Sequence, residues 1–499
     1  MKNRILKNLQ LNLLITIITG VLGFVINKYF SEYMGMEILG LMRLFSQLIA
    51  YLSLAELGVG TASAYALYRP LLEQDTDRIN TVLSTINSFY KKIALFILIV
   101  GILLNFTLSF FIKFDYKTIN IYIYWSLYVI NTSIGYIFAK YSILFTANQE
   151  YGFVRKIQGI GRIIFQGLQL FSIIIFQSFN LFIILLICEN VFNFYFLKKH
   201  YNKEYFYIKN VKNRDKNIIK DIKNIFWHKL AGVIVFNTDY IILSTFLDLS
   251  IIAIYSSYLI IYQMVMTIMN ISTPVLSPHI GKFVAQNNKE KIYLYWKELY
   301  YLHLVLAIIV VFVTYKVINP FIELWIGKEY LLPDSTVILI MINLFINITR
   351  KMIDVFSSSS GFFDDIHVPF LESIINFVLS IVLVQYIGLN GVIFGTVVSN
   401  ILIICILKPM LTFKRCFDKS GVDYIKEFII NLGYIAISIG LLNLVIGNFE
   451  YVLNFNSWLD WIISSVKLTI ITIIIVVSVF LFNKYFREIL KKYVFILMK

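Results

Sequence analysis

The chain has 499 residues, of which 59% are hydrophobic, 16% are aromatic and only 15% are charged. A soluble domain carries about 25% charged residues, so most of this surface must face lipid and a soluble protein is excluded. Apolar runs of about 20 residues indicate helices that cross a hydrocarbon core of about 30 Å, whereas a transmembrane β-barrel would show short alternating segments. We therefore expect an all-α polytopic membrane protein.

The apolar runs predict about fourteen transmembrane helices. In chain order they cover residues 11–30, 38–68, 86–112, 119–147, 153–176, 181–197, 225–246, 251–283, 299–318, 336–356, 368–386, 392–413, 428–446 and 458–482. Gly58 and Gly60 are expected to interrupt the second helix, and Pro274 and Pro278 the eighth.

The net charge of +15 follows from the distribution of Lys and Arg along this topology. With the N-terminus inside, the predicted cytoplasmic segments hold 35 of the 44 basic residues, ten of them in the central stretch Lys198–Lys229. The positive-inside rule then predicts that both termini are cytoplasmic. It also explains the basic composition without a nucleic-acid partner.

The two halves of the chain resemble each other. A shift of 213 residues places Tyr29–Asn80 on Ile242–Tyr293 without a gap, and it carries Ser31 onto Ser244. The predicted organisation is an N-terminal lobe (1–200), a basic linker (201–224), a C-terminal lobe (225–413), and a second linker with two added helices (414–499). Two parallel six-helix repeats indicate pseudo-two-fold symmetry, with a site expected between the lobes.

The predicted helix 153–176 carries a polar stripe on one face. Its members are spaced three, four, four and three residues apart: Arg155, Gln158, Arg162, Gln166 and Gln169. Such side chains facing lipid would cost several kcal/mol each, so this face is expected to line a wet cavity or to meet polar groups of other helices.

A second stripe follows the predicted helix 336–356, with Asn343, Asn347, Arg350 and Asp354 at helical spacing. Arg350 and Asp354 stand at positions i and i+4, where they can neutralise each other. The stripe can therefore be structural or can line the substrate path. Tyr255, Tyr258 and Tyr262 form an aromatic stripe that could stack on sugars, but packing against lipid or in the core is its expected role.

Four further ionisable residues fall within predicted spans: Arg43, Glu56, Glu189 and Asp239. An acid at membrane depth is either linked to a proton or another ion, or paired with a cation such as Arg43, Lys28 or Arg162. Glu56, Asp239 and Glu189 are the candidates for coupling to H⁺ or Na⁺, and Arg43 is a candidate for substrate binding.

Enzyme signals are absent from the sequence. The five His residues have no metal spacing, the predicted outside loops are too short for a catalytic domain, and no nucleotide-binding motif is present. We expect no metal and no cofactor beyond a coupling ion.

The order of these features resembles the Wzx-type polysaccharide flippases of the MATE-like (MOP) superfamily. The local cues are Gly35–Gly40 (GMEILG), Glu56–Gly60 (ELGVG) and Asn237–Leu243 (NTDYIIL), followed by Ile254–Ser256. The cavity cations of that family vary, so the resemblance transfers no fixed site; it places only Arg43, Arg162 and Asp239 where lumen charges are expected.

The resemblance implies a flippase of the bacterial inner membrane that moves an undecaprenyl-diphosphate-linked O-antigen or capsule unit to the outer leaflet. Its expected partners are that lipid-linked oligosaccharide, membrane lipid, and the glycan polymerase and glycosyltransferases of the same pathway. A MATE-type drug or cation antiporter and a lipid II flippase are the alternatives. An acidic, aromatic lumen would favour the antiporter, whereas the stripe at 155–169 is cationic.

Overall fold

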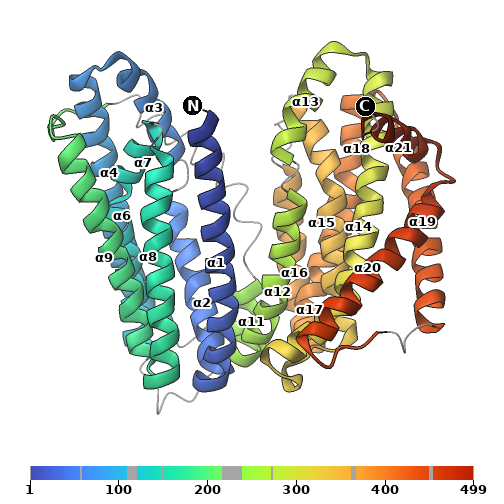
Figure 1. Cartoon of the computed structure of the whole chain (residues 1–499), viewed down its shortest axis with the longest axis horizontal. Coiled ribbons are helices and arrows are strands. Elements are labelled where there is room, and N and C mark those ends of the chain that lie inside the picture. Colours follow the sequence, from blue (N-terminus) through green and yellow to red (C-terminus); the bar gives the residue numbers. More distant parts are fainter. Residues whose placement is uncertain are drawn as a thin grey trace. The chain divides into compact units, whose positions relative to one another are not determined.

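In the computed structural model, contacts divide the chain into two compact units, Met1–Ala253 (unit 1) and Ile254–Lys499 (unit 2) (Figure 1). The structure describes residues 2–56, 59–108, 121–148, 150–215, 239–270, 273–360, 367–448 and 453–497, and throughout these ranges it contains helices and no strand. The all-α prediction is confirmed.

The helices of unit 1 form a bundle in which α8 packs against α1 on one side and α9 on the other (Figure 1). Its helices are α1 (Lys2–Met34), α2 (Met36–Leu52), α3 (Val59–Glu73), α4 (Thr76–Leu103), α6 (Ile121–Ile137), α7 (Ala139–Ala147), α8 (Tyr151–Phe171), α9 (Phe179–Glu204) and α11 (Asp239–Phe246). The boundary between the units falls within α12 (Leu249–Asn270).

Unit 2 is organised around the long helix α14, which packs on α15, α20 and α21. Its helices are α13 (Thr273–Gln286), α14 (Lys289–Ile326), α15 (Asp334–Ser359), α16 (His367–Ile387), α17 (Leu389–Ser399), α18 (Lys408–Thr412), α19 (Gly421–Asn448), α20 (Trp458–Phe480) and α21 (Lys484–Leu497). The π-helical segments Asn400–Leu407 and Phe413–Phe417 flank α18.

The observed helices follow the predicted runs, with local differences. The interruption expected in the run 38–68 separates α2 from α3 and includes a 3₁₀ turn (Ser53–Glu56). The run 251–283 is likewise divided into α12 and α13, but Pro274 and Pro278 both lie inside α13. The run 119–147, for which no break was predicted, divides at Phe138 into α6 and α7. Helix α14 is longer than its predicted 299–318, because polar residues extend it beyond the apolar segment. The helix α21 was not predicted, because its amphipathic, basic sequence gives no apolar run. Residues 225–238 of the predicted seventh helix lie outside the described residues.

The helix starts agree with the predicted shift of 213 residues. Helices α2 and α4 begin at Met36 and Thr76, and α12 and α14 begin one shift later, at Leu249 and Lys289. The caps also repeat: Asp75 and Asn288 each accept a hydrogen bond of 3.0 Å from the backbone N–H three residues on. The hydroxyls of Ser31 and Ser244 each donate to the carbonyl three residues earlier.

The Gly35–Gly40 cue has a structural basis in unit 1. Gly35 has φ of +86°, a conformation that favours glycine, and it precedes the first residue of α2. A Cβ on Gly40 would lie 2.0 Å from the backbone oxygen of Leu249, so only glycine permits this approach of α2 to the start of α12.

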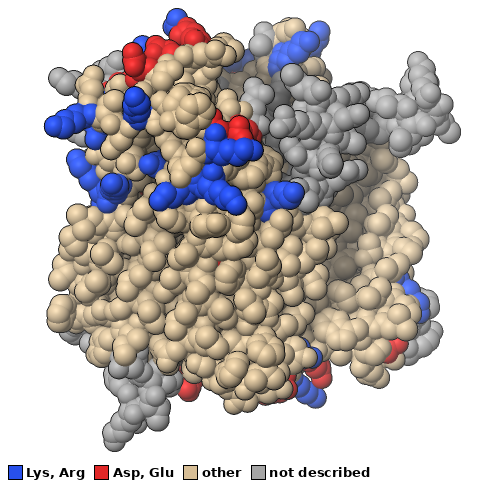
Figure 2. Space-filling view, turned by 60° about the vertical axis from the view of Figure 1, so that its left-hand side comes forward, with Lys and Arg blue, Asp and Glu red and all other residues tan. Residues whose placement is uncertain are grey.

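Within the part of the chain that the structure describes, eleven helical segments are long and apolar enough to cross a membrane, so the chain is a multi-pass membrane protein. Figure 2, in which unit 1 comes forward, shows most of the visible Lys and Arg at the upper end of this face, then a broad belt almost free of charge, and a few charged residues along the lower edge. This pattern agrees with a hydrocarbon belt bounded by a basic surface. The count of fourteen spans is compatible with the described helices, and the sidedness stays a prediction.

The start of the basic linker is fixed to unit 1. Backbone N–H groups of Lys209, Val211 and Asp215 donate to the side chains of Asn80, Ser84 and Thr85 on α4, at 2.8–2.9 Å. The linker is therefore anchored up to residue 215. The predicted lobe boundaries stay a prediction, because residues 216–238 lie outside the described ranges.

The added C-terminal helices are attached to α14 by polar contacts as well as by apolar packing. Lys297 on α14 forms an ion pair with Glu427 on α19, and its ammonium lies 4.5 Å from the ring centre of Tyr485 on α21. The indole N–H of Trp461 on α20 donates to the carbonyl of Val317 at 3.0 Å. These contacts make residues 421–497 part of unit 2.

Candidate functional site

The predicted stripe on α8 is divided between surface and interior. The side chains of Arg155 and Arg162 are exposed, that of Gln158 is half-buried, and those of Gln166 and Gln169 are buried. The guanidinium of Arg155 donates to the hydroxyl of Tyr151 at 2.5 Å. The stripe thus presents two exposed cations on the surface and two amides inside unit 1.

The buried amides of α8 retain unused hydrogen-bonding capacity. Gln166 Oε1, Gln169 Nε2 and, on the neighbouring α9, Asn193 Oδ1 are buried without a hydrogen-bond partner among the described residues. Helix α9 approaches closely here: a Cβ on Gly161 would lie 2.9 Å from Asn193 Oδ1. Buried polar atoms are normally satisfied, so these amides are suited to a hydrogen-bonding ligand.

Glu189 lies beside this stripe. It is half-buried on α9, and Arg162 lies close enough for its charge to act on the Glu189 carboxylate. The adjacent Asn190 donates to Asn131 on α6 at 2.8 Å, which ties α9 to that helix. The structure therefore brings together Arg162, predicted for substrate binding, and Glu189, predicted for ion coupling.

Arg43 lies where several helices of unit 1 meet. Its Nη2 donates to Asn27 Oδ1 on α1, and Tyr128 on α6 and Tyr240 on α11 are close enough to interact with its charge. Its Nε is buried and has no hydrogen-bond partner among the described residues. Among the described residues Arg43 is contacted by neutral groups, and its Nε–H is free to donate to an anion.

The two remaining acids of unit 1 have different surroundings. Glu56 accepts a hydrogen bond of 3.0 Å from the Tyr90 hydroxyl. The ring of Tyr136 stacks on that of Tyr90, and its hydroxyl also hydrogen-bonds to the Glu56 carboxylate. Asp239, the first described residue of α11, is half-buried near Tyr51, and no described residue forms an ion pair with it. The sequence did not indicate Tyr90 and Tyr136, because they belong to other helices.

The predicted stripe on α15 is paired within unit 2. Arg350 Nε lies 3.2 Å from Asp354 Oδ2, as the i,i+4 spacing predicted, and Lys408 on α18 forms a second ion pair with Asp354. Glu372 on α16 is only 5% exposed and lies within the field of all three charges. Lys408 stands 54 positions from Asp354 in the sequence, so only the fold shows that it pairs with α15.

The amides of α15 are also satisfied. Asn343 accepts a hydrogen bond of 3.1 Å from Asn400, and Asn347 hydrogen-bonds to Tyr262 and to the Asn343 carbonyl. Tyr258 is fully buried, and its hydroxyl donates to Asn319 at 2.6 Å, so the predicted packing role of the tyrosine stripe is confirmed there. Among the described residues, no three His, Cys, Asp or Glu side chains could hold a metal ion.

No family model and no curated protein matches this chain. Several solved structures match it. The lipid II flippase MurJ, in an inward closed conformation, matches with a TM-score of 0.72 and 15% identity over 94% of this chain and 98% of that one.

Two MATE structures match less of the chain. An inward-facing multidrug resistance MATE family transporter of the MOP superfamily has a TM-score of 0.63 and 13% identity, over 79% of this chain and 94% of its own. The Vibrio cholerae MATE transporter VcmN has a TM-score of 0.52 and 13% identity, over 84% of this chain and 98% of its own. At these identities the likeness establishes the fold alone: this chain has the fold shared by MurJ and the MATE transporters.

Proposed function

We propose that this protein is a flippase that moves a polyprenyl-diphosphate-linked oligosaccharide from the cytoplasmic to the outer leaflet of a bacterial inner membrane by alternating access. The observation that carries the proposal is the face of α8, where the exposed Arg155 and Arg162 stand beside amides with free hydrogen-bonding capacity. Guanidinium groups suit a diphosphate, and amides suit sugar hydroxyls.

The share of the chain that each solved structure matches supports a lipid-linked substrate over a drug. MurJ matches 94% of this chain, whereas the two MATE transporters match 79% and 84%. The added segment 414–499 contains 86 of the 499 residues, about as much as the MATE transporters leave unmatched. The larger match therefore favours the lipid II flippase MurJ over the MATE transporters as the guide to the class of substrate.

The roles follow from the chemistry of each position. Arg162 and Arg43 meet the diphosphate, and Gln158, Gln166 and Gln169 meet sugar hydroxyls. Asp239, which has no ion pair among the described residues, is the first choice for coupling to H⁺ or Na⁺, before Glu56, whose carboxylate already accepts tyrosine hydrogen bonds. The glycan polymerase and the glycosyltransferases of the same pathway are the proposed partners.

The test is complementation of a deletion strain with Arg162→Ala, with surface glycan measured at matched expression. Lys156→Ala is the control, because Lys156 is an exposed cation on the same helix but lies off the stripe. We expect Arg162→Ala to lower surface glycan at least tenfold and Lys156→Ala to restore it. Full restoration by Arg162→Ala contradicts the assigned role.

The same deletion strain separates the alternatives. Loss of viability with accumulation of lipid II would identify a lipid II flippase, and a gain in drug sensitivity with normal surface glycan would identify an antiporter. The proposed function requires a viable strain that lacks only the glycan.

A further inference from the structure

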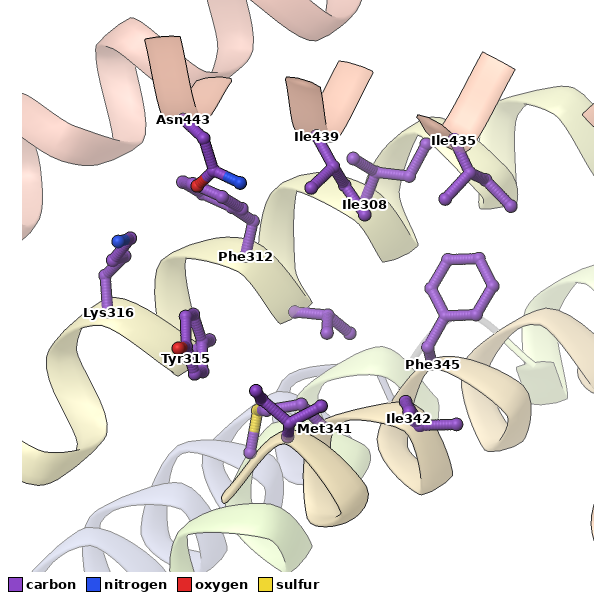
Figure 3. A pocket seen from close by; sticks show the side chains of 12 residues that line it. Ile308, Phe312, Tyr315, Lys316, Met341, Ile342, Phe345, Ile435, Ile439 and Asn443 are labelled. Atoms are coloured by element: carbon purple, nitrogen blue, oxygen red, sulfur yellow. The ribbon is translucent and has the colours of Figure 1, made fainter. Parts of the chain in front are cut away.

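A groove of about 400 Å³ lies within unit 2 between α14, α15 and α19 (Figure 3). Its walls are apolar over most of their length, with Ile308, Phe345 and Ile435 at one end. Several lining side chains, including Ile338 and Ile439, are more than a third exposed. The groove therefore opens on the apolar surface of the unit, where lipid is the solvent.

The polar groups of the groove gather at its other end. Figure 3 shows Lys316 and Tyr315 of α14 and Asn443 of α19 there, away from Phe345 and Ile435. This end lies toward the C-termini of α14 and α19 and the N-terminus of α15, which the predicted topology places at the outer surface.

Lys316 supplies a cation that no acid of the described residues neutralises. Its ammonium lies 5.5 Å from the ring centre of Tyr315 and 5.9 Å from that of Phe312, and it forms no ion pair within the described ranges. An ammonium held over aromatic rings at a membrane surface attracts an anionic headgroup.

The dimensions match a single acyl chain. Ile308 and Lys316 are eight residues apart on α14, or about 12 Å along the helix, and one leaflet contributes about 15 Å of hydrocarbon. A cavity of about 150 Å³ accommodates one benzene molecule, so 400 Å³ suits roughly one fatty acyl tail and is too small for the much longer polyprenyl chain.

We propose that this groove binds an anionic phospholipid of the outer leaflet, with one acyl tail between α14, α15 and α19 and the phosphate on Lys316, Tyr315 and Asn443. The site is independent of the proposed transport path. It fills the space between α19 and the rest of unit 2 and would stabilise that contact.

The test is native mass spectrometry of the full-length, delipidated protein titrated with phosphatidylglycerol and with phosphatidylcholine of the same acyl chains. The wild-type protein should retain phosphatidylglycerol at least fivefold better. Lys316→Gln should remove that preference. Lys328→Gln, which changes an exposed lysine outside the groove, should keep it.

A second pair of variants tests the tail. Ile439→Trp fills the groove and should weaken binding of both lipids, whereas Ile437→Trp places the same bulk on an exposed position of α19 that does not line it. Equal retention of both lipids by the wild-type protein, or unchanged binding in Lys316→Gln or Ile439→Trp, would leave only nonspecific surface lipid and overturn the proposal. Melting temperatures matching the two control variants show that the tested variants are folded.

Discussion

Helices α8 and α15 carry polar stripes with nearly the same spacing, yet the two stripes have opposite surroundings. On α15, Arg350 and Asp354 pair with each other and with Lys408, and Asn343 is hydrogen-bonded to Asn400. On α8, the cations are exposed, and the buried Gln166 Oε1 and Gln169 Nε2 have no hydrogen-bond partner among the described residues. Polar groups that are paired hold helices together, and polar groups that remain unpaired are available to a ligand.

The largest expected effect is on stability, at the paired stripe. Asp354→Asn removes the acid between Arg350 and Lys408 and leaves two largely buried cations uncompensated, at a cost of roughly 3 kcal/mol. Thermal unfolding in detergent should show a clear fall in the melting temperature. Asp334→Asn, at the exposed start of the same helix, is the control. An equal, small shift in both variants would mean that α15 is not held by its charges.

For the unpaired stripe on α8 we expect the reverse: a small effect on stability and a large effect on transport. Gln169→Leu removes a buried amide whose Nε2 lacks a partner among the described residues, so the free energy of unfolding should change by less than about 1 kcal/mol. Under the proposed function, transport should still fall about tenfold, the cost of one lost hydrogen-bonding group of about 1.4 kcal/mol. The amount of surface glycan in the complemented deletion strain measures transport. A variant that is destabilised but fully active would contradict this prediction.

A polar cluster with several hydrogen bonds lies at the N-terminal edge of α8, outside the spans. Burial tends to raise the pKa of Glu150, but hydrogen bonds from Tyr205, His200 and Asn148 outweigh it and hold that pKa below its usual 4.5. The carboxylate therefore contributes stability above pH 4.5 that is lost as the pH falls through the lowered pKa.

Glu150→Gln should remove this pH-dependent contribution, which we expect to be below about 1 kcal/mol for a partly exposed group. Melting temperatures of the wild-type protein and the variant should differ at pH 6 and converge as the pH falls through the lowered pKa. Glu204→Gln, at the exposed end of α9, is the control. A constant difference at every pH would assign the effect to packing rather than charge.

The smallest expected effect concerns Glu189. Arg162, the cation beside it, is exposed, so Glu189→Gln should lower stability by only a few tenths of a kcal/mol, far less than Asp354→Asn. A loss of stability as large as that of Asp354→Asn would show that an ion pair holds α8 and α9 together in the same way as α15 and α18. The comparison needs both melting temperatures in the same detergent.

The amino-acid sequence alone predicted the helical membrane class, the positions of most helices and the repeat of 213 residues. These features depend on local hydrophobicity and on caps such as Asp75 and Asn288, which act within a few residues along the chain. The pair Arg350–Asp354 was predictable for the same reason, because it lies within one helix.

Only the tertiary structure decided which stripe is paired. Lys408 meets Asp354 across 54 positions of the chain, Tyr90 meets Glu56 across 34, and Asn193 approaches Gly161 from another helix. The groove beside Lys316 likewise requires α14, α15 and α19 to pack side by side. Helical spacing shows which side chains share a face, but the neighbour that this face meets depends on how distant helices pack together.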